Sequence, residues 1–336
     1  MFLTNKTTVI AKLEASPYDG SGETLAIADF NVRIRNDISY GPEMDEYRRK
    51  YLDGTLDHVL SVPGRQRGTC SFTVDMAPGA LVNTEPAWGK LLEACGFFVT
   101  GWNANVEVAV GSAVEGISWR PHTDITHTPI TLEIHEQAEG ASSDFLVTRF
   151  ISAMGNVTFA IGTVGEPIQM NFEFTGAFES MVDLASPGIV HTTFSTTKPG
   201  AILGSTVTIG GVAQDLDTFE FNMGNEISEW VDPARTTGIK GYYKSAFEPT
   251  LTVNPTMKKL SEEAVYTEWL NCTPGAVLII AANGSDPDIT LSAPVAQRTA
   301  VAIGDRNGAR TADTTFLLTQ GAAGNDVFEV LQGAKT

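Results

Sequence analysis

Cysteine is scarce in this sequence. Its three residues, Cys70, Cys95 and Cys272, are an odd number and lack the paired spacing of a metal site. We interpret them as small, buried side chains of a protein made in a reducing cytosol. The first 16 residues also lack the apolar core of a signal peptide, and no apolar run has the length of a membrane-spanning helix. Neither a disulfide framework nor a helical membrane anchor is therefore expected.

Positive charge is scarce as well. Lys and Arg number 22 against 40 Asp and Glu, which gives a net charge of −18. Binding nucleic acid through its phosphates requires clustered cations, so this composition argues against a DNA-binding protein. An acidic chain can still lie beside nucleic acid as a repelling wall. The length of 336 residues allows roughly two domains, each with its own core.

Motifs that carry chemistry are missing too. The sequence has no nucleophile elbow, no P-loop and no dinucleotide fingerprint. His122, Asp124 and His127 lie close together, but they have no further candidate ligand elsewhere, so we predict no metal site. Residues 19–22 and 284–288 resemble calcium loops without the terminal Glu, and we interpret them as turns. We therefore predict no enzyme and no cofactor.

The chain does contain clear β-strand patterns. Residues 155–177 contain a Gly-rich turn, and after it four apolar side chains alternate with polar ones: Ile168, Met170, Phe172 and Phe174. Period-two alternation indicates a half-buried strand, so this stretch predicts a β-hairpin. Further strands are predicted at 30–35, 69–75 and 130–135 by the same alternation.

A long polar stretch, residues 40–68, separates two of these strands and holds a large share of the positive charge: Arg48, Arg49, Lys50, Arg65 and Arg67. Long connections in compact domains are uncommon and are either functional or disordered. This one is therefore a solvated, mobile loop or a loop that contacts an acidic surface of a neighbouring copy. Residues 1–22 are predicted to be an N-terminal arm, loose in a monomer.

The same order of segments occurs twice along the chain. FEFNMGNEIS (219–228) aligns with FNVRIRNDIS (30–39), and a helix predicted at 84–96 with Thr84 as N-cap aligns with one at 261–271. Two shorter matches follow, 130–132 with 289–291 and 158–159 with 315–316.

These matches favour a tandem duplication. We predict an N-terminal arm (1–22), a first domain (23–185), a linker (186–200) and a second domain (201–336), both domains being mainly β (α+β) sandwiches or barrels with one flanking helix. The second copy also has a long, locally basic connection, with Arg235, Lys240 and Lys244.

Three features together resemble the major tail tube proteins of long-tailed bacteriophages. They are the strand pair NVTFAIGTVGEPIQMNFEFTGAF (156–178), the helix EPAWGKLLEACGF (85–97) and the long connection that ends in SVPGRQRG (61–68). The resemblance covers nearly the whole chain as architecture. It implies a structural virion protein whose inner strands join those of neighbours, so that rings stack into a hollow tube through which DNA passes. The long loops would bridge successive rings.

The resemblance also implies the composition of the assembly. The family commonly has six tube units per ring, so a doubled chain implies a trimeric, pseudo-hexameric ring, or six chains if only one copy lines the lumen. Partners would be further copies, tail tip and tail terminator proteins, and the tape measure protein and genomic DNA in the lumen. Candidate lumen-facing acids are Glu133, Glu173 and Glu220, and the basic residues named above are candidates for contacts between rings.

Three alternatives stay open at this point. A tube of a contractile secretion apparatus shares the architecture. A two-domain carbohydrate-binding module would need exposed aromatic platforms in both copies, whereas Trp102 and Trp119 have no partners in the second copy. An enzyme with a site built from distant residues would show no local motif.

Overall fold

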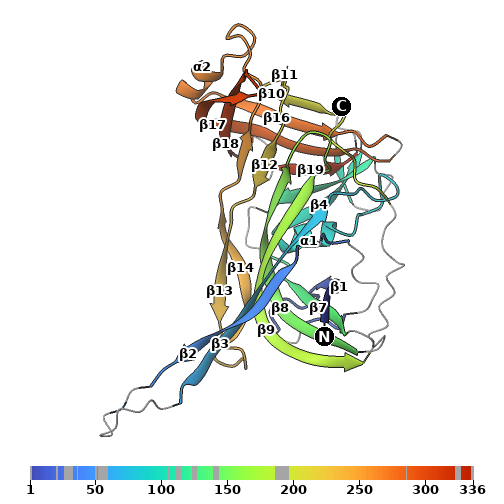
Figure 1. The fold of residues 1–336 in the computed structure, drawn as a ribbon, viewed down its shortest axis with the longest axis vertical. Helices are drawn as coiled ribbons and strands as arrows, with labels where there is room; N and C mark the ends of the chain where they lie inside the picture. The colour runs from blue at the N-terminus through green and yellow to red at the C-terminus, as the bar shows by residue number, and fades with distance from the viewer. Residues whose placement is uncertain are drawn as a thin grey trace.

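The computed structural model describes residues 2–19, 22–25, 33–35, 37–49, 51, 60–103, 106–109, 115–122, 127–138, 144–185, 197–284, 286–321 and 327–333. The fold is mainly β, as predicted, and the helices of the described residues are two short ones (Figure 1). These are α1 (Gly89–Ala94) in the first half of the chain and α2 (Val265–Leu270) in the second.

The strands of the first half precede residue 186. They are β1 (Phe2–Leu13), β2 (Ser39–Tyr47), β3 (Val62–Asp75), β4 (Phe97–Asn103), β5 (Val106–Val108), β6 (Gly116–Pro121), β7 (Ile130–Ala138), β8 (Asp144–Ile161) and β9 (Gln169–Ala185). Those of the second half are β10 (Thr206–Ile209), β11 (Val212–Ala213), β12 (Phe219–Asn222), β13 (Asn225–Val231), β14 (Ile239–Phe247), β15 (Thr250–Val253), β16 (Pro274–Ala281), β17 (Ile289–Arg306), β18 (Ala309–Leu318) and β19 (Glu329–Gln332).

Eight strands follow one another through both halves without a break, in the order β2-β3-β9-β8-β12-β15-β18-β17, as one run of a larger antiparallel sheet. We call this run the eight-stranded sheet. Each half supplies four of them. The halves meet where β12 pairs with the end of β8, with Phe221 opposite Phe159. Paired strands are joined by backbone hydrogen bonds, and their opposed side chains pack against one another. The two halves are therefore joined by hydrogen bonds as well as by packing.

The pairing order repeats between the halves. In the first half β7 pairs with β8 and β1 with β7; in the second β16 pairs with β17 and β10 with β16. By this order β17 takes the place of β8, and β16 takes that of β7. The match of residues 130–132 with 289–291 therefore joins strands of different position, because the first range lies in β7 and the second in β17. The match of 158–159 with 315–316 does so too, because these ranges lie in β8 and β18. Residues 30–32 and 36 of the first match lie outside the described residues.

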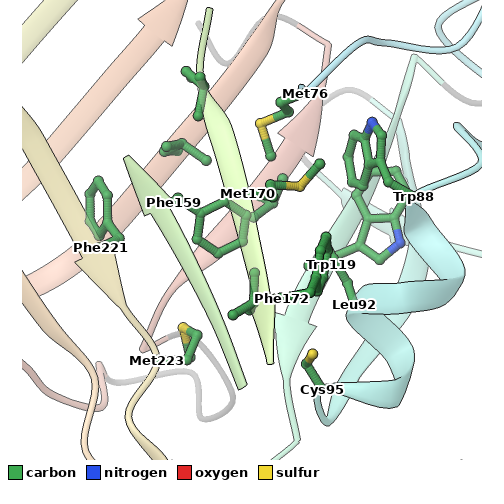
Figure 2. Close-up of a cluster of buried hydrophobic side chains, with 14 of the residues drawn as sticks. Met76, Trp88, Leu92, Cys95, Trp119, Phe159, Met170, Phe172, Phe221 and Met223 are labelled. Carbon is green, nitrogen blue, oxygen red and sulfur yellow. The ribbon is translucent and has the colours of Figure 1, made fainter. Parts of the chain in front are cut away.

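One side of the eight-stranded sheet carries a buried core. A single row of paired residues crosses seven strands on this side: Val74, Met170, Phe159, Phe221, Leu251, Phe316 and Arg298. All of them are buried. Figure 2 shows Phe221 of the second half beside Phe159 and Met170 of the first, with Trp119 and Leu92 next to them. The halves therefore share one hydrophobic core rather than having one each.

The row ends in a buried ion pair. Arg298 lies on the core side of β17 and donates to Glu263 Oε1 at 2.6 Å, and it also pairs with Glu268 of α2. Gln214 donates to the other carboxylate oxygen of Glu263 at 2.8 Å. This network attaches α2 and the turn before it to the sheet.

The N-terminal segment is a strand of the sheet rather than a loose arm, since β1 pairs with β7 at Phe2 and from Thr7 to Leu13. Directly after it, the buried carboxylate of Glu14 accepts hydrogen bonds from the amide and hydroxyl of Ser152, at 2.6 and 2.9 Å. Ser152 has a positive φ of 47° in a bulge of β8. The carboxylate therefore holds a backbone conformation that a serine seldom adopts.

Several boundaries differ from the sequence prediction. Both helices are shorter than predicted and begin after turns rather than at Thr84 or Ser261. In the first case Gln332 donates to the carbonyl oxygens of Leu81, Val82 and Thr84, which holds these residues in a loop. Residues 40–68, predicted to be a loop, include β2 and the start of β3.

The predicted hairpin at 155–177 is confirmed as β8 and β9, and its four apolar residues are buried. The strands predicted at 69–75 and 130–135 are confirmed as parts of β3 and β7. Cys70 and Cys95 are buried as expected, whereas Cys272 is exposed, because it follows the outer helix α2.

Candidate functional site

The side of the eight-stranded sheet opposite the core is polar and carries small side chains. One row of paired residues crosses it as Thr73, Asn171, Thr158, Asn222, Thr250, Leu317 and Gln297. The next row is Asp75, Gln169, Ala160, Glu220, Thr252, Thr315 and Ala300. Neither row contains Lys or Arg. This surface, which we call the polar face, is therefore neutral to acidic along these two rows, and at its edge Asp75 is paired with Arg35 at 2.8 Å.

Two of the three candidate lumen acids lie on the polar face. Glu173 and Glu220 are exposed, and each alternates along its strand with buried phenylalanines of the core. Glu133 lies elsewhere, on β7, where its carboxylate is 2.9 Å from His135 Nε2 and accepts from Arg149 at 3.0 Å. Burial raises the pKa of Glu133, but these two partners outweigh it and hold that pKa below the ordinary value.

The polar face ends in two unpaired strand edges. Within the described residues, β2 pairs with β3 alone. At the other end, residues 299–306 of β17 pair with β18 on one side and with no described strand on the other. Ile303 on this edge is 58% exposed. Open edges of this kind invite pairing with another chain.

The hairpin β2–β3 projects beyond the body of the molecule (Figure 1). Large apolar side chains are exposed along it: Met44, Tyr47, Leu60 and Val62. Its guanidinium groups are engaged locally, because Arg48 pairs with Glu46 at 3.4 Å and Arg49 donates to the carbonyl oxygen of Leu60 at 2.9 Å. Lys50 lies outside the described residues.

Closer to the body, two guanidinium groups join this hairpin to the hairpin β13–β14. Arg65 pairs with Asp45 at 3.1 Å and with Glu229 of β13, and Arg67 pairs with Glu43 at 3.2 Å. The charge of Glu229 raises the pKa of Arg65. These two candidate inter-ring cations are thus balanced within the chain.

The remaining basic candidates lie on or near β14. Lys244 is only 6% exposed, and its ammonium group donates to the carbonyl oxygens of His122 and Gly96. Lys240 lies over the ring of Trp230, 3.9 Å from its centroid. Arg235 donates to the carbonyl oxygen of Tyr18 and pairs with Asp232. Of these cations, Lys244 therefore lies deepest inside the chain.

The described part of the chain has no group of three His, Cys, Asp or Glu side chains placed to bind a metal ion. In the predicted His-Asp-His cluster, His127 Nε2 is 3.0 Å from the carbonyl oxygen of Lys244, and Asp124 lies outside the described residues. Trp102 and Trp119, the possible sugar platforms, are 8% and 0% exposed. Among the described residues, no helix has the length and apolar character needed to cross a membrane.

The amino-acid sequence matches a known family over residues 4–317, which is nearly the whole chain. This chain belongs to the phage tail tube protein family. It is therefore a structural component of a phage tail tube and not an enzyme. Family membership implies assembly with further tail proteins and a place in the virion tail. A comparison with curated proteins finds no match.

Two features of this tail tube protein escaped the sequence analysis. One is the open edge of β17, whose only signal is that Val301 and Ile303 alternate with small residues just before a turn. The other is the segment after β1, where Glu14 and Tyr18 reach other parts of the chain. Their partners are more than 100 residues away, so no local pattern could indicate them.

Proposed function

We propose that three copies of the chain close into a ring, that rings stack into a hollow tube, and that the polar face lines the lumen through which DNA passes. The observation that carries the proposal is the unbroken eight-stranded sheet, to which each half contributes four strands in the same order. Because both halves share this sheet, both would line the lumen, which favours three chains over six.

The two open edges support closure into a ring. A monomer would leave one side of β17 unpaired near its end, and likewise the edge along β3 that is formed by β2 and by the segment around Ile34; joining these edges in successive copies covers them. Such a contact joins unlike surfaces, and unlike contacts either close a ring or continue as a filament. On this view residues 23–185 and 201–336 are two tandem tube units joined by the linker 186–200.

The chemistry of the polar face suits a passage for DNA. Its small side chains leave few protrusions, and Glu173 and Glu220 repel phosphate, so that DNA could slide without being held. Tail tip and tail terminator proteins would bind the ends of the tube, and the tape measure protein would occupy the lumen before DNA. The hairpin β2–β3, with its exposed apolar residues and Arg48 and Arg49, would bridge successive rings.

Negative-stain electron microscopy of the concentrated protein tests the assembly. Hollow rings or tubes with threefold or pseudo-sixfold class averages are the expected result, with an initiator complex added if the chain alone stays dispersed. Dispersed chains under every condition, with and without the initiator, would contradict the proposal.

Charge reversal tests the lumen. The double variant Glu173→Lys and Glu220→Lys should form normal tubes that retain DNA and eject it poorly. The control Glu262→Lys, at an exposed position before α2, should eject normally. Equal ejection by both variants would mean that the polar face does not meet DNA.

A further inference from the structure

The junction between the two halves is a sheet pairing that the second half could offer again to another copy. At this junction Phe219 of β12 lies opposite Ile161 of β8, and Phe221 lies opposite Phe159. All four side chains are at most 3% exposed. Asn156 reinforces the pairing by donating to Asn222 at 3.1 Å and accepting from the amide of Asn225 at 3.0 Å.

The second half has an edge that corresponds to the end of β8. Phe159 lies opposite Met170 of β9, and Met170 lies opposite Val74, the last buried residue of β3. In the equivalent strands, Val301 lies opposite Thr314 of β18, and Thr314 lies opposite Val253 of β15.

Val301 therefore occupies the position of Phe159, and Ile303 occupies that of Ile161. Ile161 is 3% exposed because β12 covers it, whereas Ile303 is 58% exposed because no described strand covers that edge.

The first half has a segment that corresponds to β12. Phe219 of β12 pairs with Val253, and Ile34 pairs with Val74 in the same way. Strand pairing thus aligns Ile34 with Phe219, a shift of four residues from the sequence match, which aligns Phe30 with Phe219. The amide of Arg35 donates to the carbonyl oxygen of Thr73 at 2.8 Å, which aligns this segment with β3. Ile34 also packs against the hydrophobic core. No other described strand pairs with the segment on its far side.

We propose that the edge of β17 in one copy pairs antiparallel with the segment around Ile34 in the next copy, so that Ile303 lies opposite Ile34. This pairing repeats between chains the contact that Ile161 and Phe219 make within the chain. It rests on the proposed ring and specifies the partner, a second copy, and the register.

The adjacent pair of residues fits this register. In the internal junction the small residue Ala160 lies opposite the charged Glu220. In the proposed one the small residue Ala302 lies opposite Arg35, whose guanidinium is already paired with Asp75 at 2.8 Å. A small residue opposite a charged one leaves room for the longer side chain in both cases. The apolar pair Ile303 and Ile34 would lose its exposed surface on the core side of the sheet.

A disulfide trap tests the register. The variant Ile34→Cys/Ile303→Cys is made in a Cys272→Ser background, because the other two native cysteines are buried. Directly opposed residues in antiparallel strands have Cα atoms about 4.5–5.5 Å apart, which permits a disulfide. Assembled tubes oxidised with copper phenanthroline should give covalent trimers on a non-reducing gel, and the single-cysteine variants and the pair Ile34→Cys/Leu260→Cys should not.

A second variant gives a result even if the cysteine pair impairs assembly. Ile303→Lys should fold normally, as judged by circular dichroism, and should lose ring formation. Leu260→Lys, at a position 62% exposed in the turn before α2, is the matched control and should assemble. Two results would overturn this interface and leave the proposed tube intact. One is that the Ile34→Cys/Ile303→Cys variant forms tubes but gives no covalent trimer after oxidation. The other is that the Ile303→Lys variant forms rings. Wild-type chains that never form rings would overturn both.

Discussion

The shared core can be tested by removing one phenylalanine at the junction of the halves. Phe221 belongs to the second half, is fully buried, lies opposite Phe159 of the first half and has its ring centroid 4.9 Å from that of Phe328. The variant Phe221→Ala loses this burial and leaves a cavity in a tightly packed cluster. Substitutions of this kind cost about 3–5 kcal/mol.

The measurement is urea unfolding of the dispersed chain, followed by hydrogen exchange and mass spectrometry so that each half is observed separately. With a urea m-value of at least about 3 kcal/mol/M for a chain of this length, the midpoint should fall by about 1 M. Because Phe221 packs on both halves, peptides from β9 and from β18 should lose protection together. The control Ile303→Ala, at an exposed position, should change the free energy of unfolding by no more than about 0.5 kcal/mol.

A midpoint shift confined to peptides of the second half would refute the reasoning. It would mean that the two halves unfold as separate domains and that the junction of β8 with β12 contributes little. A decrease of less than about 1 kcal/mol in the free energy of unfolding of both halves would refute it too, because the cost of the cavity would then be absent.

Three further predictions concern single groups. Glu263→Ala should reduce the free energy of unfolding by about 1–3 kcal/mol, because Arg298 and Gln214 lose a buried acceptor while Glu268 still balances the charge of Arg298, and an unchanged free energy of unfolding would contradict the buried network. The stability contributed by the depressed pKa of Glu133 is present at neutral pH and lost as pH falls through that pKa, so Glu133→Gln should flatten the decline of melting temperature between pH 5 and pH 3; an unchanged slope would contradict the assignment. Of the three thiols, Cys272 alone should react with a maleimide in the folded chain, and rapid modification of a second thiol would show that the core opens.

Strands in which apolar and polar residues alternate were predictable from the sequence, because burying one face of a strand requires an apolar residue at every second position. The pattern of Ile168, Met170, Phe172 and Phe174 predicted β9, and the burial of all four follows from the row of core residues across the sheet. The outer part of the hairpin β2–β3 was not predictable as strands. Residues 42–47 and 60–63 project from the body and are mostly exposed on both faces, so the sequence carries no apolar stripe there.

The candidate acids show the same limit. Glu173 and Glu220 follow buried neighbours in regular strands, so alternation alone put them on the exposed side of the sheet. Glu133 has the same local pattern, but β7 pairs with β8 beside the run of eight strands, and there the carboxylate pairs with Arg149 of β8. The place that a strand takes within a sheet depends on pairings between distant residues, and no single-sequence pattern records them.

The partners of the basic residues within the chain were not predictable for a related reason. A cluster of Lys and Arg in an acidic chain suggests a contact with another molecule, yet Arg65 and Arg67 find Asp45, Glu43 and Glu229 within the chain. These residues belong to the hairpins β2–β3 and β13–β14, which are far apart in the sequence and come together only in the folded chain.

The number of chains in one ring tests the central claim most directly, and cryo-electron microscopy of assembled tubes would measure it. We predict three chains per ring, each contributing eight strands to a closed barrel whose inner surface carries Glu173 and Glu220. A ring of six chains in which only one half of each lines the lumen would contradict the prediction, as would a barrel lined by the core side of the sheet.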